Sequence, residues 1–217
     1  NEDRQCNVPE GLSNVKAISA GLFHSVALKE DGEIIAWGWN DYEQCDVPAG
    51  LSNAKAISAG YDHTVALKED GTVVAWGRND CYQCDVPADL KNAKEISAGY
   101  GYTVALKEDG TVVAWGINDG YQCNVPPDLA NVKAISAGGG HAVALKEDGK
   151  IVTWGWSYYK QCDVPADLGN VKAVSAGEYH TVALKEDGTV VAWGRKKESK
   201  IYVPKDLINV KAISAGG

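Results

Sequence analysis

Residues 54–77 read AKAISAGYDHTVALKEDGTVVAWG, and most of this stretch returns throughout the chain. Its Ser-Ala-Gly recurs every 39 residues, at the positions that begin with Ser19, Ser58, Ser97, Ser136, Ser175 and Ser214. A fixed period of about 20 to 50 residues is typical of repeat architectures, in which each unit buries its apolar face against its neighbours. We therefore expect residues 1–217 to form a single repeat-array domain.

Each repeat carries strand signals and no helical periodicity. Residues 54–59 and 63–67 are short β-like runs, and the Asp-Gly at 70–71 supplies the positive φ angles of a tight hairpin. Residues 72–77 are β-branched and aromatic, as strands prefer. With the stretch 44–48 counted as a further strand, the sequence predicts an all-β propeller built from four-stranded repeats.

The copies do not add up to a whole number of blades. Five copies of the hairpin and six copies of the Ser-Ala-Gly strand are present. Three arrangements remain open: a five-blade ring with a redundant half-blade, a six-blade ring with one half-blade, and an open arc.

Composition excludes several classes of protein. The hydrophobic content of 45% is sufficient for a core, and the longest apolar runs are too short to span a membrane. A net charge of -8 disfavours nucleic acid as a partner, because its binders usually carry a basic face. The chain contains no Met, so its native start is missing; a cleaved signal peptide and a fragment both fit. We expect an extracellular or cell-surface location.

The repeat resembles a known family. The pattern Ala-Ile-Ser-Ala-Gly-x-x-His-x-Val-Ala-Leu-Lys-x-Asp-Gly-x-Val-x-Ala-Trp-Gly-x-Asn is similar to the regulator-of-chromosome-condensation repeat. Residues 36–44 (AWGWNDYEQ), followed by Val47-Pro48, are more similar to the bacterial branch that includes β-lactamase inhibitor protein II. The resemblance implies a propeller, but its fold hosts guanine-nucleotide exchange, protein inhibition and scaffolding, so it does not decide the function.

The loops divide into two faces, because antiparallel strands alternate in direction. The loops after Ser-Ala-Gly and after Trp-Gly share one side, here called the variable face because their sequences differ between copies. The Lys-Glu-Asp-Gly turns and the turns between Pro and Asn share the other side, here called the uniform face. Lys-Glu-Asp-Gly is unchanged in all five copies.

The variable face is rich in aromatic residues, which together with Arg dominate protein-binding hot spots. We predict that nine of its residues bind a partner: Phe23, Trp39, Tyr42, Tyr61, Arg78, Tyr100, Trp156, Tyr158 and Tyr179. Tyr82 and Tyr121 repeat between copies, and we interpret them instead as framework residues that pack on neighbouring blades.

No catalytic, metal or cofactor site is predicted. The recurring His (His24, His63, His141, His180, with Tyr102 in the third copy), Trp and Cys each occupy one framework position, and no second ligand stands at zinc-like spacing. Cys81 and Cys84 form a Cys-x-x-Cys that fits a local disulfide or a chance thiol.

The chain is therefore predicted to be a non-catalytic module without a cofactor, a binding or inhibitory module that contacts a protein through its variable face. Two alternatives are a carbohydrate-binding lectin and a purely structural scaffold. Guanine-nucleotide exchange is supported by fold analogy alone.

Overall fold

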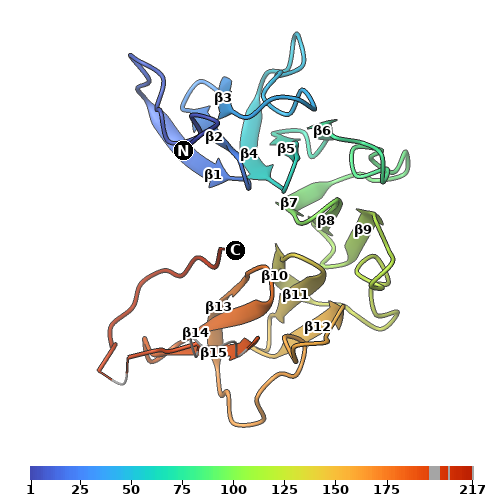
Figure 1. The fold of residues 1–217 in the computed structure, drawn as a ribbon. Coiled ribbons are helices and arrows are strands. Elements are labelled where there is room, and N and C mark those ends of the chain that lie inside the picture. The colour runs from blue at the N-terminus through green and yellow to red at the C-terminus, as the bar shows by residue number, and fades with distance from the viewer. Residues whose placement is uncertain (196–200, 205, 217) are drawn as a thin grey trace.

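A computed structural model describes residues 1–195, 201–204 and 206–216. These residues form five three-stranded antiparallel sheets, one for each complete repeat, and none of them lies in a helix. We call the sheets blades 1 to 5. They follow one another around an open arc, with the N-terminal and C-terminal blades on either side of the gap (Figure 1).

The strands have nearly constant lengths, and each blade pairs its three strands in sequence order. The blades comprise β1 (Val15–Ala20), β2 (His24–Lys29) and β3 (Ile34–Gly38); β4 (Ala54–Ala59), β5 (His63–Lys68) and β6 (Val73–Gly77); β7 (Ala93–Ala98), β8 (Tyr102–Lys107) and β9 (Val112–Gly116); β10 (Val132–Ala137), β11 (His141–Lys146) and β12 (Ile151–Gly155); and β13 (Val171–Ala176), β14 (His180–Lys185) and β15 (Val190–Gly194).

The all-β propeller fold is confirmed, but the prediction of four strands per repeat is wrong. The stretch 44–48 contains no strand: residues 44 and 45 lie in a turn, and the Gln44 carbonyl and the Cys45 N–H are bonded to side chains. The Asn40 side chain accepts a hydrogen bond from the Cys45 N–H at 2.7 Å and donates to Asp46 at 2.8 Å. Of the three arrangements left open by the sequence, the structure shows the open arc.

The sixth Ser-Ala-Gly segment is not a strand of the described structure, although it packs as one. The Val210 N–H donates to the Gly188 carbonyl at 3.1 Å, and the Ala215 N–H donates to Ser175 Oγ at 2.9 Å. The segment thus covers the flank of blade 5 without a hairpin to pair with.

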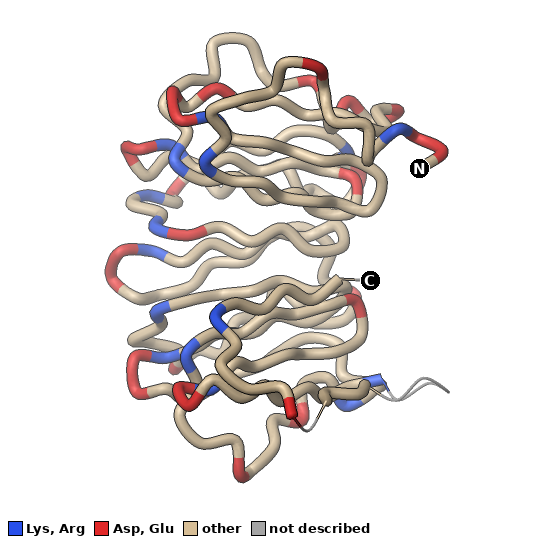
Figure 2. Tube along the Cα trace, turned by 90° about the vertical axis from the view of Figure 1, so that its left-hand side faces the viewer, with Lys and Arg blue, Asp and Glu red and all other residues tan. Residues whose placement is uncertain are grey.

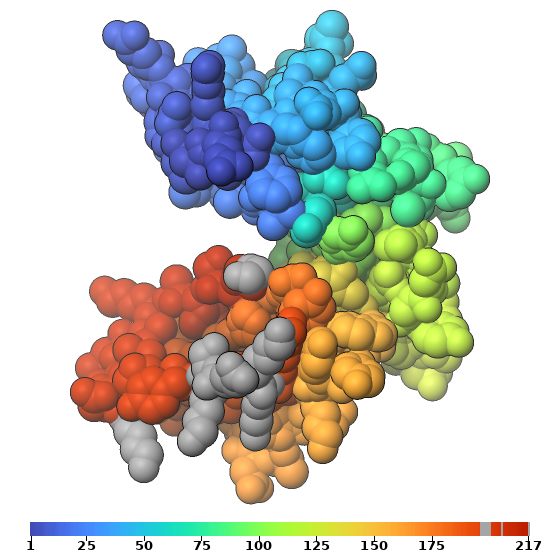
Figure 3. Space-filling view, viewed as in Figure 1, coloured from blue at the N-terminus to red at the C-terminus, as the bar shows by residue number. Residues whose placement is uncertain are grey.

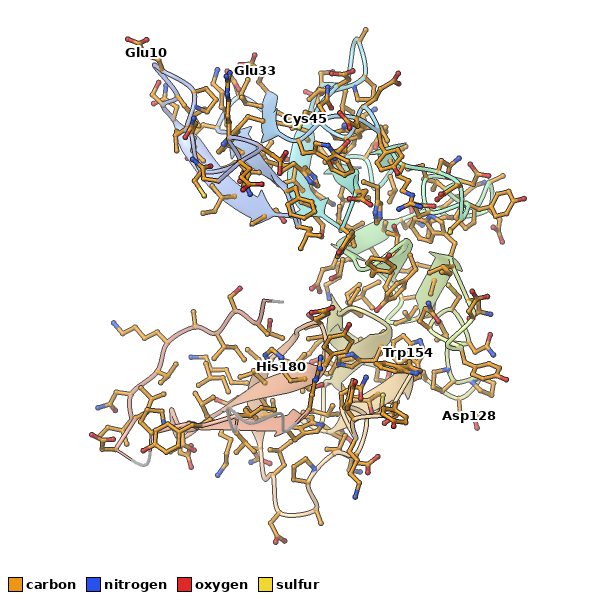
Figure 4. All side chains as sticks on the ribbon, viewed as in Figure 1. Glu10, Glu33, Cys45, Asp128, Trp154 and His180 are labelled. Carbon is orange, nitrogen blue, oxygen red and sulfur yellow. The ribbon has the colours of Figure 1, made fainter. Side chains whose placement is uncertain are left out.

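The hydrophobic core lies between blades rather than within them. Four clusters of buried side chains each join two adjacent blades. In the cluster between blades 3 and 4, Val104 and Leu106 pack with Val132 and Ile135. In Figure 4, Trp154 lies among the packed blades, whereas Glu10 and Asp128 lie at the outer edge of the arc.

The recurring serine of Ser-Ala-Gly links each blade to the next. The Ala59 N–H donates to Ser19 Oγ at 2.9 Å, and the same bond at the same distance joins every later pair of copies. The glycine of the motif is required by packing. A Cβ at Gly60 would lie 2.3 Å from the ring of His63, so no other residue fits there.

The recurring histidines also bridge blades. His24, His63 and His141 each place Nε2 about one hydrogen-bond length from a threonine hydroxyl of the next blade, at 3.0, 3.0 and 2.9 Å. The threonine hydroxyl donates its proton to the backbone carbonyl of a buried Gln, as Thr64 does to Gln44 at 2.8 Å. The imidazole Nε2 must therefore carry a proton, which the threonine oxygen accepts.

Tyr102 replaces histidine in the third copy because the next blade lacks the threonine. Ala142 stands where blade 1 has Ser25 and blades 2, 3 and 5 have Thr64, Thr103 and Thr181. The Tyr102 hydroxyl reaches past this alanine and donates to the His141 carbonyl at 2.5 Å. Tyr102 and Ala142 thus belong together: the longer side chain of the tyrosine compensates for the hydroxyl that the alanine lacks.

Tyr102→His is expected to destabilise the protein, because the new imidazole faces Ala142 with no hydroxyl to receive its proton. An unsatisfied buried polar group costs about 1 to 3 kcal/mol. Adding Ala142→Thr should restore the pair, so that the double variant is more stable than either single variant. Urea denaturation of all four proteins measures this coupling. A double variant whose loss equals the sum of the single losses would show that the pair is not coupled.

Stability is expected to fall as the pH drops from 6.5 towards 4.5. Burial lowers the pKa of His24 to about 4, of His63 to about 3 and of His141 to about 4. The unfolded chain binds protons to these groups at its ordinary pKa near 6.5, while the folded chain does not, so acid favours unfolding in this window. The denaturation midpoint measured across the window tests this.

Glu95 offers a matched control for that pH dependence. Other copies have alanine at its position, and burial raises the pKa of Glu95 to about 7. Protonating this carboxyl favours the folded state, so it opposes the histidines. Glu95→Ala should therefore steepen the loss of stability in acid. An unchanged slope would contradict the assignment of these groups.

Candidate protein-binding face

The structure brings the two variable loops of each blade together. The Trp39 N–H donates to the Phe23 carbonyl at 2.8 Å, and the Arg78 N–H donates to the Asp62 carbonyl at 2.9 Å. Figure 2 shows the charged turns of the uniform face along one side of the molecule, and Figure 3 looks onto the variable face. The loops that differ between copies thus form one continuous surface.

A buried glutamine anchors each of the four long loops of blades 1 to 4, which the sequence analysis missed. The side chain of Gln83 is almost fully buried, and its Oε1 accepts the Cys81 N–H at 2.9 Å. Its backbone carbonyl accepts the indole N–H of Trp115 at 3.0 Å. The recurrence of Gln5, Gln44, Gln83, Gln122 and Gln161 was the available signal.

Five of the predicted residues form one aromatic cluster over blades 1 to 3. Ring centroids lie 5.8 Å apart for Phe23 and Trp39, 5.2 Å for Trp39 and Tyr42, and 6.4 Å for Phe23 and Tyr61. Tyr100 extends the cluster, with its centroid 4.2 Å from that of Tyr61. The rings meet edge to face, the arrangement that aromatic pairs prefer.

Arg78 is held in place beside this cluster. It forms an ion pair with Asp80 at 2.7 Å and another with Asp62 at 3.2 Å. Its guanidinium lies over the ring of Tyr42, 4.9 Å from the centroid. Burial raises the pKa of Asp62, and the arginine opposes that rise. The arginine therefore reaches the surface with little conformational freedom left to lose on binding.

The other three predicted residues belong to a second cluster, over blades 4 and 5. Trp156 stacks on Tyr158 with an interplanar angle of 13°, and its centroid lies 5.8 Å from that of Tyr179. Two members were missed by the sequence analysis. Tyr159 lies between these rings, and the Arg195 guanidinium lies 4.8 Å from both Tyr159 and Tyr179. Their place in a variable loop was the signal.

The two clusters are separated by residues with little or no side chain. Gly101, Gly120, Gly139 and Gly140 occupy positions that carry larger side chains in other copies. Gly140 replaces residues such as Phe23 and Tyr179, although its backbone has no positive φ angle that would demand glycine. The nine predicted residues thus form two aromatic groups on one face rather than a single ring of contacts.

The interpretation of Tyr82 and Tyr121 as packed framework residues is wrong. Their exposed fractions are 70% and 68%, among the highest of the large apolar side chains. They are exposed to solvent instead of packing on neighbouring blades.

The described residues contain no group of three or more His, Cys, Asp or Glu side chains that could hold a metal ion. Cys81 and Cys84 are free thiols, and burial raises the pKa of Cys84 to about 12. A thiol with such a pKa is a poor nucleophile at neutral pH. In the part of the chain that the structure describes, no helix is long and apolar enough to cross a membrane.

Comparison with protein families gives five matches along the chain. The family model described as "Regulator of chromosome condensation (RCC1) repeat" matches residues 15–44, 54–83, 93–122, 132–161 and 171–196. The chain belongs to the RCC1 repeat family. A comparison with curated protein sequences gives no match.

Solved structures similar to this RCC1-repeat chain share its fold. Yeast RCC1 (Prp20), solved with Kap60 bound, aligns with a TM-score of 0.76 and 22% identity over 96% of this chain and 67% of its own. A second structure of Prp20p from Saccharomyces cerevisiae, whose description includes binding to Gsp1p and histones, gives 0.77 and 23% over 92% and 61%. The ectodomain of the Physcomitrella patens receptor kinase CR4 gives 0.80 and 25% over 97% and 58%. The chain therefore spans about three fifths to two thirds of these proteins.

Arg78→Met is expected to lower the stability of this RCC1-repeat chain by about 1 to 3 kcal/mol, because the buried Asp62 carboxylate loses its charged partner. The deficit relative to the unaltered protein should shrink as the pH falls, since protonation neutralises Asp62. Denaturation at pH 7 and pH 4.5 measures both effects. Lys160→Met, which removes an exposed cation of the same face, serves as the control and should change stability little. A deficit that stays constant with pH would contradict the ion-pair explanation.

Proposed function

We propose that this chain is a non-catalytic module that binds a protein through the two aromatic clusters of its variable face. One observation carries the proposal: the loops of one surface differ between otherwise repeated blades, and many of the residues that differ there are aromatic or arginine side chains. Such side chains supply large contact areas at a small cost in conformational entropy. The core does not explain them, because it is built from the recurring positions.

The RCC1-repeat neighbours support a binding role. Prp20 is described with Kap60 bound and with binding to Gsp1p and histones. These partners belong to those proteins and are not transferred to this chain. What supports the proposal is that this fold presents surfaces to which other proteins bind.

Inhibition is the finer form of the proposal. Arg78 is held by two carboxylates, and a buried glutamine anchors the long loops of blades 1 to 4. A surface held this firmly loses little entropy on binding, which favours tight association. A rigid module that covers the working surface of a partner blocks it without any chemistry of its own.

Affinity capture with the purified chain as bait, followed by mass spectrometry, would identify the partner. The same capture with a Trp39→Ala and Trp156→Ala double variant separates specific partners from background proteins. A glycan array with the unaltered chain tests the lectin alternative, since exposed aromatic rings also stack on sugars. Retention of glycans but of no protein would overturn the proposal.

Truncation of the aromatic side chains is expected to weaken binding to the purified partner while changing stability little. Each of Trp39, Tyr42, Tyr61, Trp156 and Tyr158 replaced by alanine should lose about 2 kcal/mol of binding free energy where it lies at the interface centre, or roughly thirtyfold in affinity. Isothermal titration calorimetry and thermal melting measure the two effects separately.

The controls for these variants lie on the uniform face. Glu30→Ala, Glu69→Ala and Glu108→Ala remove exposed carboxylates from the recurring turns, and they should alter neither affinity nor melting temperature. Tight binding by aromatic variants that melt much lower would show that the rings are framework. Affinity lost by the glutamate variants would place the interface on the uniform face.

A further inference from the structure

Five residues of the variable face share an uncommon backbone conformation. Arg4, Glu43, Tyr82, Tyr121 and Lys160 have φ angles of 60°, 62°, 63°, 63° and 63°. Each immediately precedes an anchoring glutamine, so they occupy one position of the repeat. A left-handed conformation is costly for residues other than glycine, asparagine and aspartate. We call these five residues the left-handed row.

The loop itself imposes this conformation. In the second long loop, the Tyr82 N–H closes a turn onto the Asn79 carbonyl at 3.2 Å. The next residue, Gln83, must then bury its side chain and present its carbonyl to Trp115. Only a left-handed residue between the turn and the glutamine satisfies both requirements. The fold therefore fixes the backbone of the row but not the identity of its side chains.

The uniform face meets the same requirement differently. Its left-handed positions include five asparagines, with φ angles between 53° and 59°: Asn14, Asn53, Asn92, Asn131 and Asn209. Asparagine tolerates this conformation because its short side chain bonds locally with the backbone. The chain thus uses a suitable residue on one face and five large side chains of four different types on the other.

Packing does not account for those side chains. All five are exposed, and the described structure assigns none of them a side-chain hydrogen bond or an ion pair. Because the loop fixes the backbone of the row, the identity of the side chains is what remains to be explained. A side chain kept at such a cost and used by nothing inside the fold is best explained by a contact outside it.

We propose that the left-handed row determines which protein this chain recognises. The inference rests on the proposed protein-binding function and adds a second set of contacts to the aromatic clusters. Along the arc the row begins with the cation of Arg4, passes through Glu43, Tyr82 and Tyr121, and ends with the cation of Lys160. The matching partner surface carries carboxylates near the two ends of the row and an apolar centre that the tyrosines cover.

The first test needs only the chain itself. Tyr82→Gly and Tyr121→Gly remove the left-handed penalty, so each should raise the melting temperature by about 2 to 4 °C in a chain of this size. Asn92→Gly on the uniform face is the matched control and should change the melting temperature by less. Glycine also raises the entropy of the unfolded chain, which Asn92→Gly measures. If the tyrosine variants melt lower than Asn92→Gly does, the fold needs these side chains and the proposal is overturned.

The second test measures binding, with the partner recovered by the bait and then expressed and purified as the probe. Tyr82→Gly and Tyr121→Gly should each weaken binding by about tenfold or more, although both variants are more stable. Arg4→Gly and Lys160→Gly should weaken it less at high salt than at low salt, because salt screens their attraction to carboxylates. Asn92→Gly should bind normally.

The aromatic variants distinguish the failure of this inference from the failure of the proposed function. If Trp39→Ala and Trp156→Ala bind weakly while the glycine variants bind normally, the aromatic face stands and the left-handed row is not a determinant. If the two tryptophan variants bind normally, the proposed function itself fails. The inference is supported if Tyr82→Gly and Tyr121→Gly raise the melting temperature and weaken binding to the partner.

Discussion

Each blade of this protein is completed by the next one. A serine hydroxyl of one copy accepts a hydrogen bond from a backbone N–H of the following copy, as Ser19 does from Ala59. The apolar clusters also join neighbouring blades. A three-stranded sheet of this size could not bury both its apolar face and its polar edge alone. The serine must therefore recur at the repeat period, since its hydroxyl accepts a backbone N–H of the next copy.

This dependence leaves the variable loops free to change. Bonds such as that of the Asn79 side chain with the Cys84 N–H, and the burial of Gln83, set the path of a long loop. The residues between these anchors contribute little to the core, so they differ from copy to copy. The Lys-Glu-Asp-Gly turns of the uniform face show no such division of roles, because they are identical in all five copies.

Most of the fold could be predicted from the sequence, and the site in part. The period, the Asp-Gly hairpins and the β-branched runs predicted the all-β propeller, because each is a local signal. The fourth strand was wrong because Asn40 diverts the backbone bonds of the following residues into turns, a competition that strand propensity does not show. Tyr82 was misjudged because recurrence was equated with packing, whereas what recurs there is the left-handed backbone.

Interactions between nearest neighbours also limit how far a substitution is felt. Blade 1 shares its apolar cluster with blade 2 alone, whereas blade 5 shares a different cluster with blade 4. A substitution in a loop of blade 1 is therefore expected to affect blade 2 and to leave blade 5 unchanged. Effects at well-separated positions should therefore add, as they do for distant sites in general. Phe23 and Trp39 are in contact and will couple, while the cluster over blades 4 and 5 responds independently of them. The residues of one aromatic cluster can therefore be substituted without changing the other cluster or the core between the blades. This independence follows from a core that repeats and loops that do not.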